Sequence, residues 1–255
     1  MGLSNDQLDR YARHIVLHDV GGTGQMRLLK ARVALVGAGG IGSPAGLYLA
    51  AAGVGHLTIL DDDHVALSNL QRQVLYSTKD VGLAKGTVAA TRLKALNPDI
   101  EISARPVRLT DDNAVDLLAG HDLVLDGSDS YKTRLAVNRA AVALGIPLVS
   151  AALGPFEGQL SVFKGYDPAL PCYQCLVPSI PPDEEAQSCT ALGILGAVAG
   201  VMGSWAALEV LREITGVGES LAGRLLLFDA KSTRTRTVGL RKDPACPACA
   251  APLCL

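Results

Sequence analysis

A glycine-rich turn between a strand pattern and a helix pattern constrains this chain more than any other feature. The apolar run 32–36 predicts a buried strand, Gly37-Ala-Gly-Gly-Ile-Gly42 follows it, and a helix is expected over 43–52. Glycines let a backbone turn tightly and approach a phosphate closely, while N–H groups at the helix start attract its charge. We therefore predict that this turn binds an adenine nucleotide through Gly37, Gly39, Gly40 and Gly42. The alternative is that the glycines serve only strand–helix packing.

The same alternation of strand and helix patterns continues to residue 152. Further strands are expected over 56–61, near 100, over 121–126 and over 146–152, and helices over 85–96, 111–119 and 131–144. Beyond 154, hairpin-like strands over 159–164, 224–230 and 233–240 surround an apolar helix. This pattern predicts an α/β fold with a Rossmann-like, doubly wound, mostly parallel sheet that continues into antiparallel strands. We expect one compact domain made of a helical arm (1–30), a nucleotide-binding half (31–153) and a second half (154–255).

Composition excludes several classes of protein. The net charge of −2 is too even for a protein held to nucleic acid or anionic lipid by bulk charge. A chain that is 49% hydrophobic and 19% charged is not disordered. We read no secretory signal at the N-terminus and expect a cytoplasmic location. The apolar run 191–208 has a membrane-like composition, but its acidic flanks favour a buried helix of a protein without a membrane span.

Charged residues follow the predicted strands. Asp61 lies 24 residues after Gly37, where a carboxylate can accept hydrogen bonds from a ribose. Arg72 and Lys85 could offset the charge of a triphosphate, and Asp129 could hold magnesium. Each has a simpler interpretation, since the two cations could be surface charges and Asp129 could cap the next helix. Their joint placement after successive strands favours a site at the carboxyl edge of the sheet.

Five segments, in order, resemble the MoeB/ThiF adenylyltransferase family, bacterial relatives of the ubiquitin-activating enzymes: 10–14, 37–42, 68–73, Lys85 and 126–129. The resemblance covers about residues 6–249. It implies an enzyme that uses ATP and Mg²⁺ to adenylate the C-terminal glycine of a ubiquitin-like sulfur carrier protein ending in Gly-Gly, releasing pyrophosphate. It further implies that the second half, 154–255, binds this carrier. Ser130 departs from the pattern, because relatives often have Asn there.

The same resemblance implies roles for individual residues. Asp61 would contact the ribose, while Asn69, Arg72 and Lys85 would contact the phosphates, with Gln73 in the same nucleotide-binding run. Asp129 would hold the magnesium. Arg13 would reach into the neighbouring subunit of a homodimer.

Two CxxC pairs have the spacing that is typical of metal ligands: Cys172/Cys175 and Cys246/Cys249. Four thiolates form a closed tetrahedral site, so we predict a structural Zn²⁺ that ties the C-terminal tail to the loop after residue 164. The alternative is two independent redox or free-thiol pairs. Cys189 is expected at the start of the apolar helix, where the dipole favours a reactive thiolate. It resembles a family cysteine that takes part in carrier or sulfur transfer. The alternative is that Cys189 is only a small buried hydrophobic residue with no chemical role.

Other functions are compatible with parts of this pattern. An NAD-dependent oxidoreductase would share the glycine-rich turn, a tRNA-modifying dehydratase of the same superfamily would also adenylate a carboxylate, and a zinc-stabilised scaffold would bind a carrier without turnover. The sequence does not identify the carrier. It also does not show whether the pathway leads to molybdopterin, thiamine or another product. We expect a sulfurtransferase or cysteine desulfurase to act in trans as sulfur donor, and no direct contact with nucleic acid.

Overall fold

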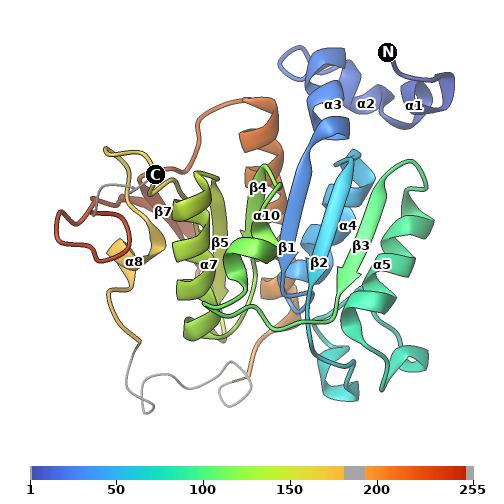
Figure 1. The fold of residues 1–255 in the computed structure, drawn as a ribbon. Helices are drawn as coiled ribbons and strands as arrows, with labels where there is room; N and C mark the ends of the chain where they lie inside the picture. Colours follow the sequence, from blue (N-terminus) through green and yellow to red (C-terminus); the bar gives the residue numbers. More distant parts are fainter. Residues whose placement is uncertain (1, 181–192, 251–255) are drawn as a thin grey trace.

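One eight-stranded sheet forms the centre of the molecule, which is described by a computed structural model over residues 2–180 and 193–250 (Figure 1). The strand order is β3-β2-β1-β4-β5-β6-β7-β8. Strands β1 to β5 pair in parallel, and β6, β7 and β8 continue the sheet in antiparallel pairs. Their bounds are Arg32–Val36, His56–Leu60, Glu101–Arg105, Leu123–Asp126, Leu148–Leu153, Glu157–Phe163, Arg224–Asp229 and Arg234–Gly239. The predicted fold class is confirmed.

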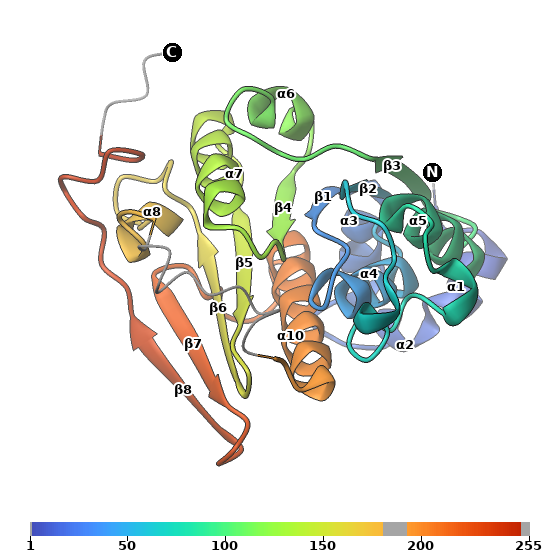
Figure 2. The same cartoon turned by 90° about the horizontal axis from the view of Figure 1, so that it is seen from below.

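Helices cover both faces of the parallel part of the sheet (Figure 2). On one face α4 (Gly42–Ala52), α5 (Lys85–Leu96) and α10 (Gly196–Thr215) pack against alternate strand residues such as Val33 and Leu35. On the other face α6 (Ala114–Leu118) and α7 (Tyr131–Leu144) cover Ala34 and Val36. Successive side chains of a strand point to opposite faces. Burial on both faces therefore explains why residues 33–36 are continuously apolar.

Predicted and observed helix bounds differ where side chains bond to the backbone. The helix expected over 111–119 is shortened to α6 because the carboxamide of Asn113 accepts a hydrogen bond from the Thr110 N–H and forms a turn. The apolar helix is displaced toward the C-terminus. α10 begins at Gly196 and continues to Thr215, past the apolar run, because the buried carboxylate of Glu209 accepts bonds from Arg212 and from the Leu221 N–H.

Helix α10 is the buried helix that the sequence favoured. It packs on α4, β5 and β6, and Val198, Met202 and Ala206 are at most 2% exposed. Among the residues that the structure describes, no helix has the length and hydropathy needed to cross a membrane.

Three short helices form the N-terminal arm: α1 (Asn5–Arg10), α2 (Ala12–Ile15) and α3 (Gly21–Lys30). Ser4 caps α1 by accepting a hydrogen bond from the Gln7 N–H. Because α3 ends immediately before β1 begins, the arm lies at the amino-terminal edge of the sheet (Figure 1). The buried amide of Gln25 attaches it there by bonding His14 and the Ala52 carbonyl at the end of α4.

Gly203 sets how closely α10 approaches the first turn of α4. A Cβ at this position would lie 2.4 Å from Pro44 Cγ and 2.5 Å from the Ile41 carbonyl oxygen. We expect Gly203→Val to destabilise the fold by about 2 kcal/mol or more, because α4 must move. At Gly200, one turn earlier, a Cβ would meet no atom within 4 Å, so Gly200→Ala should stabilise by about 0.5 to 1 kcal/mol. Denaturant unfolding measures both, and equal effects would refute this packing.

Candidate functional site

A cavity of about 460 Å³ opens at the carboxyl ends of β1, β2 and β4. The order of the strands reverses between β1 and β4, and the connections after these strands leave in opposite directions. In doubly wound sheets this reversal creates the crevice in which ligands bind. The loops after the three strands supply Gly37, Asp61 and Asp129 to its wall.

The glycine-rich turn forms the floor of the cavity. Gly37 has a φ of 83°, and a Cβ on it would lie 3.2 Å from backbone atoms of Gly127 and Ser128. At Gly42 a Cβ would meet the Gly37 carbonyl oxygen at 1.9 Å, so this glycine permits the turn to close. Helix α4 then begins without any side-chain cap. The Ser43 N–H donates to the Gly39 carbonyl and Pro44 carries no N–H, so what this helix start offers to an anion is mainly the positive end of its dipole.

Three side chains hold the turn at Ala38. Asp61 accepts a hydrogen bond from the Ala38 N–H at 2.7 Å, while the hydroxyls of Tyr76 and Ser43 donate to the Ala38 carbonyl at 2.8 and 3.0 Å. Burial raises the pKa of Asp61, whereas the bond to Ala38 opposes the rise. These contacts keep the turn in one conformation before any ligand binds.

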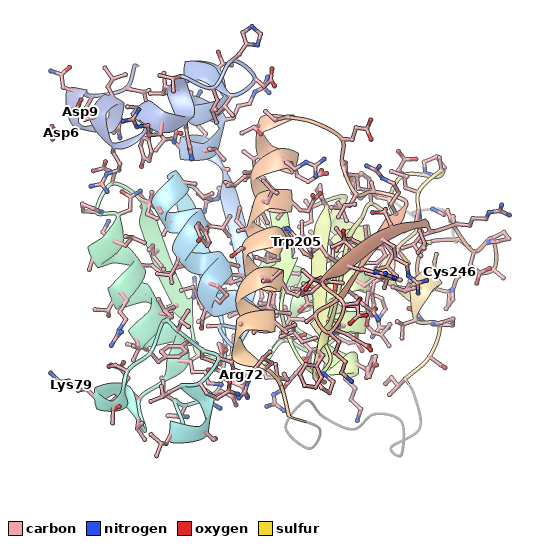
Figure 3. All side chains as sticks on the ribbon, turned by 180° about the vertical axis from the view of Figure 1, so that it is seen from behind. Asp6, Asp9, Arg72, Lys79, Trp205 and Cys246 are labelled. Atoms are coloured by element: carbon pink, nitrogen blue, oxygen red, sulfur yellow. The ribbon has the colours of Figure 1, made fainter. Side chains whose placement is uncertain are left out.

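The acidic run 61–63 distributes its charge over different partners. Asp62 pairs with Arg108 at 3.0 Å, and Asp63 pairs with Lys85 at 3.0 Å. The Lys85 side chain is only 6% exposed but reaches the cavity wall. Arg72 also lines the cavity and donates to the Ser68 carbonyl at 3.1 Å. Figure 3 shows Arg72 beside the N-terminal end of α10, whereas Lys79 points into solvent.

Unsatisfied polar atoms concentrate at this site. Among the described residues, Gln73 Oε1, Asp126 Oδ2 and Ser128 Oγ are buried without a hydrogen-bond partner. Gln73 and Ser128 line the cavity, and Asp126 ends β4 directly beneath it. Buried polar groups in folded proteins nearly always have partners. Their concentration here indicates that a polar ligand or ordered water completes the site.

The structure brings most of the predicted nucleotide-binding residues together. The cavity wall includes Gly37, Gly39, Gly40, Asp61, Arg72, Gln73, Lys85 and Asp129. Gly42 and Asn69 do not belong to this wall: Gly42 closes the turn, and Asn69 accepts a hydrogen bond from the Ala66 N–H. Arg13 lies in the N-terminal arm at the opposite edge of the sheet. Cys189 lies outside the described residues, and α10 begins at Gly196 rather than near this cysteine.

Arg134 lines the cavity and was missed at the sequence level. Its guanidinium donates from Nε and Nη2 to the Ser128 carbonyl at 3.0 and 2.5 Å, and from Nη2 to the Ala151 carbonyl at 3.2 Å. One signal was present in the sequence. Lys132 and Arg134 both lie near the start of α7, where the helix dipole disfavours positive charge, and an acidic residue is absent from that turn.

Comparison with known proteins decides the family. The ThiF family model matches residues 11–248. The chain belongs to the ThiF family. A sulfur carrier protein adenylyltransferase from Thermus thermophilus is 48% identical over 98% of this chain and 93% of the relative. The sulfur carrier protein ThiS adenylyltransferase of Escherichia coli is 45% identical over 94% of both chains. The crystal structure of E. coli MccB with ATP has a similar fold, with a TM-score of 0.82 at 24% identity over 95% of this chain and 75% of MccB.

In this ThiF-family chain the two CxxC pairs meet. Cys172, Cys175, Cys246 and Cys249 place their sulfur atoms within 4.8 Å of one another. The pairs 172/246 and 175/249 are 3.6 and 3.5 Å apart, and 172/175 are 3.9 Å apart. A tetrahedral zinc with bonds of about 2.3 Å needs sulfur separations of about 3.8 Å. Burial raises the pKa of the Cys172 thiol to about 11, so this thiol is protonated without a metal, and the four sulfur donors together fit a metal that displaces thiol protons.

The buried Asp126 carboxyl group, of which only Oδ2 lacks a hydrogen-bond partner, generates a prediction about pH. Burial raises the pKa of Asp126 above the value near 3.9 that is typical of unfolded chains, although the Arg134 guanidinium opposes the rise. The folded state therefore holds this proton more tightly, and the ionised carboxyl makes folding less favourable once the pH rises above about 4. We expect Asp126→Asn to melt a few degrees above wild type at pH 7, with an advantage that shrinks toward pH 4. A pH-independent difference in melting temperature would contradict this.

Proposed function

We propose that this protein uses magnesium and ATP to adenylate the C-terminal glycine carboxylate of a ubiquitin-like sulfur carrier protein, giving an acyl-adenylate and pyrophosphate. The observation that carries the proposal is the open cavity in which an uncapped helix start, Arg72, Lys85 and the unpaired Gln73 and Ser128 side-chain oxygens converge. Two ThiF-family relatives that match nearly the full chain are named as adenylyltransferases of sulfur carriers, which supports the substrate class.

Adenylation of a carboxylate requires compensation of negative charge and no proton transfer from the carboxyl group. A carrier carboxylate is already ionised at neutral pH, so it needs no general base to attack the α-phosphorus. The new bond joins a carboxylate oxygen to this phosphorus, and the bond to the pyrophosphate oxygen breaks. Since two anions must approach, the barrier is largely electrostatic and positional.

Cations around the cavity would supply this compensation. Arg72 lies over Gly40, where a Cβ would be 3.6 Å from the arginine side chain, and would bind phosphate oxygens beside the turn. Lys85 would exchange its bond to Asp63 for a phosphate oxygen. The exposed Asp129 carboxylate would hold Mg²⁺, which neutralises phosphate charge when bound. Asp61, with Gly39 and Gly40, would fix the nucleoside end.

A second, smaller cavity supports the proposed protein substrate. It has a volume of about 200 Å³, lies between β5, β6 and α8 (Tyr173–Leu176), and shares Tyr131, Arg134 and Ala152 with the nucleotide cavity. Its wall includes Gly154 and Gly158, and such a narrow space suits a chain end without side chains. We propose that residues 31–153 bind the nucleotide and that residues 154–255 receive a carrier tail ending in Gly-Gly.

We also propose a structural Zn²⁺ on Cys172, Cys175, Cys246 and Cys249, supported by the sulfur separations. A closed four-thiolate site leaves no position for substrate, so its contribution is to folding. The reactive role of Cys189 remains a proposal, because residue 189 lies outside the described ranges. We also propose that a sulfurtransferase or cysteine desulfurase supplies the sulfur in trans.

Carrier-dependent exchange of labelled pyrophosphate into ATP tests the function. Candidate carriers ending in Gly-Gly should support exchange, and Lys85→Ala should reduce its rate by about 100-fold or more, as expected for loss of one charge-stabilising donor. Lys79→Ala is the matched control, because this lysine is exposed, does not line the cavity and points into solvent (Figure 3). Absence of exchange with every carrier, together with binding of a nicotinamide cofactor, would instead support an oxidoreductase.

Arg13 raises a separate proposal, a homodimer in which each subunit completes the other's site. Its neighbour His14 is linked through Gln25 to the end of α4, and the nucleotide cavity is at the start of that helix. Eleven residues of helix separate these ends by about 16 Å. This separation favours contact between Arg13 and a nucleotide bound by a second copy over contact within its own chain.

Subunit mixing tests this sharing. Arg13→Ala and Asp129→Ala proteins should each be inactive, and an exchanged equimolar mixture should regain about a quarter of wild-type activity, since half of the dimers carry one intact site. A mixture of Asp129→Ala with Lys85→Ala is the control and should regain nothing if both residues act within one chain's site. No recovery in the first mixture would place Arg13 outside the site.

A further inference from the structure

Helix α7 presents two polar side chains one turn apart to its packed surroundings. Arg134 and Asn138 are spaced i, i+4 and so lie on one face of the helix. Arg134 is partly buried and donates twice to the Ser128 carbonyl and once to the Ala151 carbonyl. Ser128 is the residue before Asp129, so this contact holds the loop that carries the Asp129 carboxylate.

Asn138 makes the corresponding contact at the cysteine cluster. It is 1% exposed and uses both ends of its amide on the first CxxC segment. Its Oδ1 accepts a hydrogen bond from the Tyr173 N–H at 2.7 Å, and its Nδ2 donates to Cys172 Sγ at 3.5 Å. The segment is therefore attached to α7 as well as to the second CxxC pair.

Tyr173 connects the two ends of this arrangement. It is 4% exposed, and its ring packs edge-on against Phe163 with centroids 5.6 Å apart. Tyr173 and Arg134 line the same small cavity, and the Arg134 guanidinium opposes the rise that burial causes in the pKa of the Tyr173 hydroxyl. A continuous set of contacts thus runs from the cysteine cluster through Tyr173 to Arg134 and on to the Ser128 carbonyl.

We infer that Arg134, Asn138 and Tyr173 are positioning residues that make the placement of the Asp129 loop, and with it the binding of magnesium–ATP, depend on the cysteine cluster. The inference rests on the proposed function of the cavity. It adds a second role to the cluster: besides attaching the C-terminal tail, the cluster orients a guanidinium that touches both the metal-binding loop and the cavity wall. Residues that orient a ligand-bearing group in this way typically change affinity 10 to 100-fold when altered.

The test compares the dissociation constant of nucleotide with and without added magnesium, measured on purified protein in the absence of carrier. Tyr173→Phe is the mildest variant because it keeps the ring packing and removes the hydroxyl. Arg134→Lys keeps the charge but not the fork that reaches two carbonyls, and Asn138→Ala removes both amide contacts. Arg139→Lys is the matched control, since Arg139 lies on the same helix in an exposed pair with Asp111.

Arg134→Lys and Asn138→Ala should each weaken magnesium–ATP binding about tenfold, with Tyr173→Phe in the same direction. Binding of ATP without magnesium should change much less, which a general loss of folding would not produce. The Arg134→Lys/Asn138→Ala double variant should be no weaker than the weaker single variant, because both break one link. Unchanged affinities, equal losses with and without magnesium, or multiplied losses in the double variant would overturn the inference. A wild-type protein that binds no magnesium–ATP would instead overturn the proposed function.

Discussion

The close contact between two backbone loops at the centre of the sheet determines the rest of this structure. A Cβ on Gly37, which follows β1, would lie only 3.2 Å from backbone atoms of Gly127, and the Gly127 N–H donates to the Val36 carbonyl. This contact joins the two halves of the parallel sheet at the point where strand order reverses. The nucleotide cavity exists because the chain after β1 turns toward α4 while the chain after β4 turns toward α7. Substituting either glycine would separate the walls that the proposed chemistry needs close together.

Charge in the cavity is arranged before a ligand arrives, and this arrangement has a cost. Asp126 is buried with one unpaired oxygen, and Lys85 is almost fully covered while bonded to Asp63. Groups of this kind lower the stability of the folded chain, yet they avoid reorganisation when a charged transition state forms. We therefore attribute these buried and unpaired polar atoms to the reaction that we propose, because they do not stabilise the folded chain.

The C-terminal part of the chain is organised differently from the part that forms the parallel strands. Every residue of β8 is exposed, and the β7–β8 hairpin projects beyond the helices that cover the rest of the sheet (Figure 2). The tail that follows β8 returns to the molecule at the cysteine cluster, where Cys172 and Cys246 are at most 1% exposed. The zinc that we propose on these cysteines would thus replace apolar packing at this end. Through Asn138 the same cluster reaches the helix that borders the nucleotide cavity.

Local signals were enough for the strand at 32–36, the glycine-rich turn, helix 131–144 and the two CxxC pairs, because apolar periodicity, positive φ and metal-ligand spacing are properties of neighbouring residues. They also placed Asp61 and Asp129 in the segments after strands and Lys85 at the start of a helix. The sequence prediction was wrong for the start of α10 and for the length of α6. The Leu195 N–H just before α10 donates to the distant Pro155 carbonyl, whereas a side-chain turn between Asn113 and Thr110 shortens α6. Only the tertiary structure brought Arg134 to Ser128, removed Asn69 from the cavity wall and set Arg13 at the opposite edge of the sheet. Such outcomes depend on how whole elements pack, and no single segment of sequence contains that information.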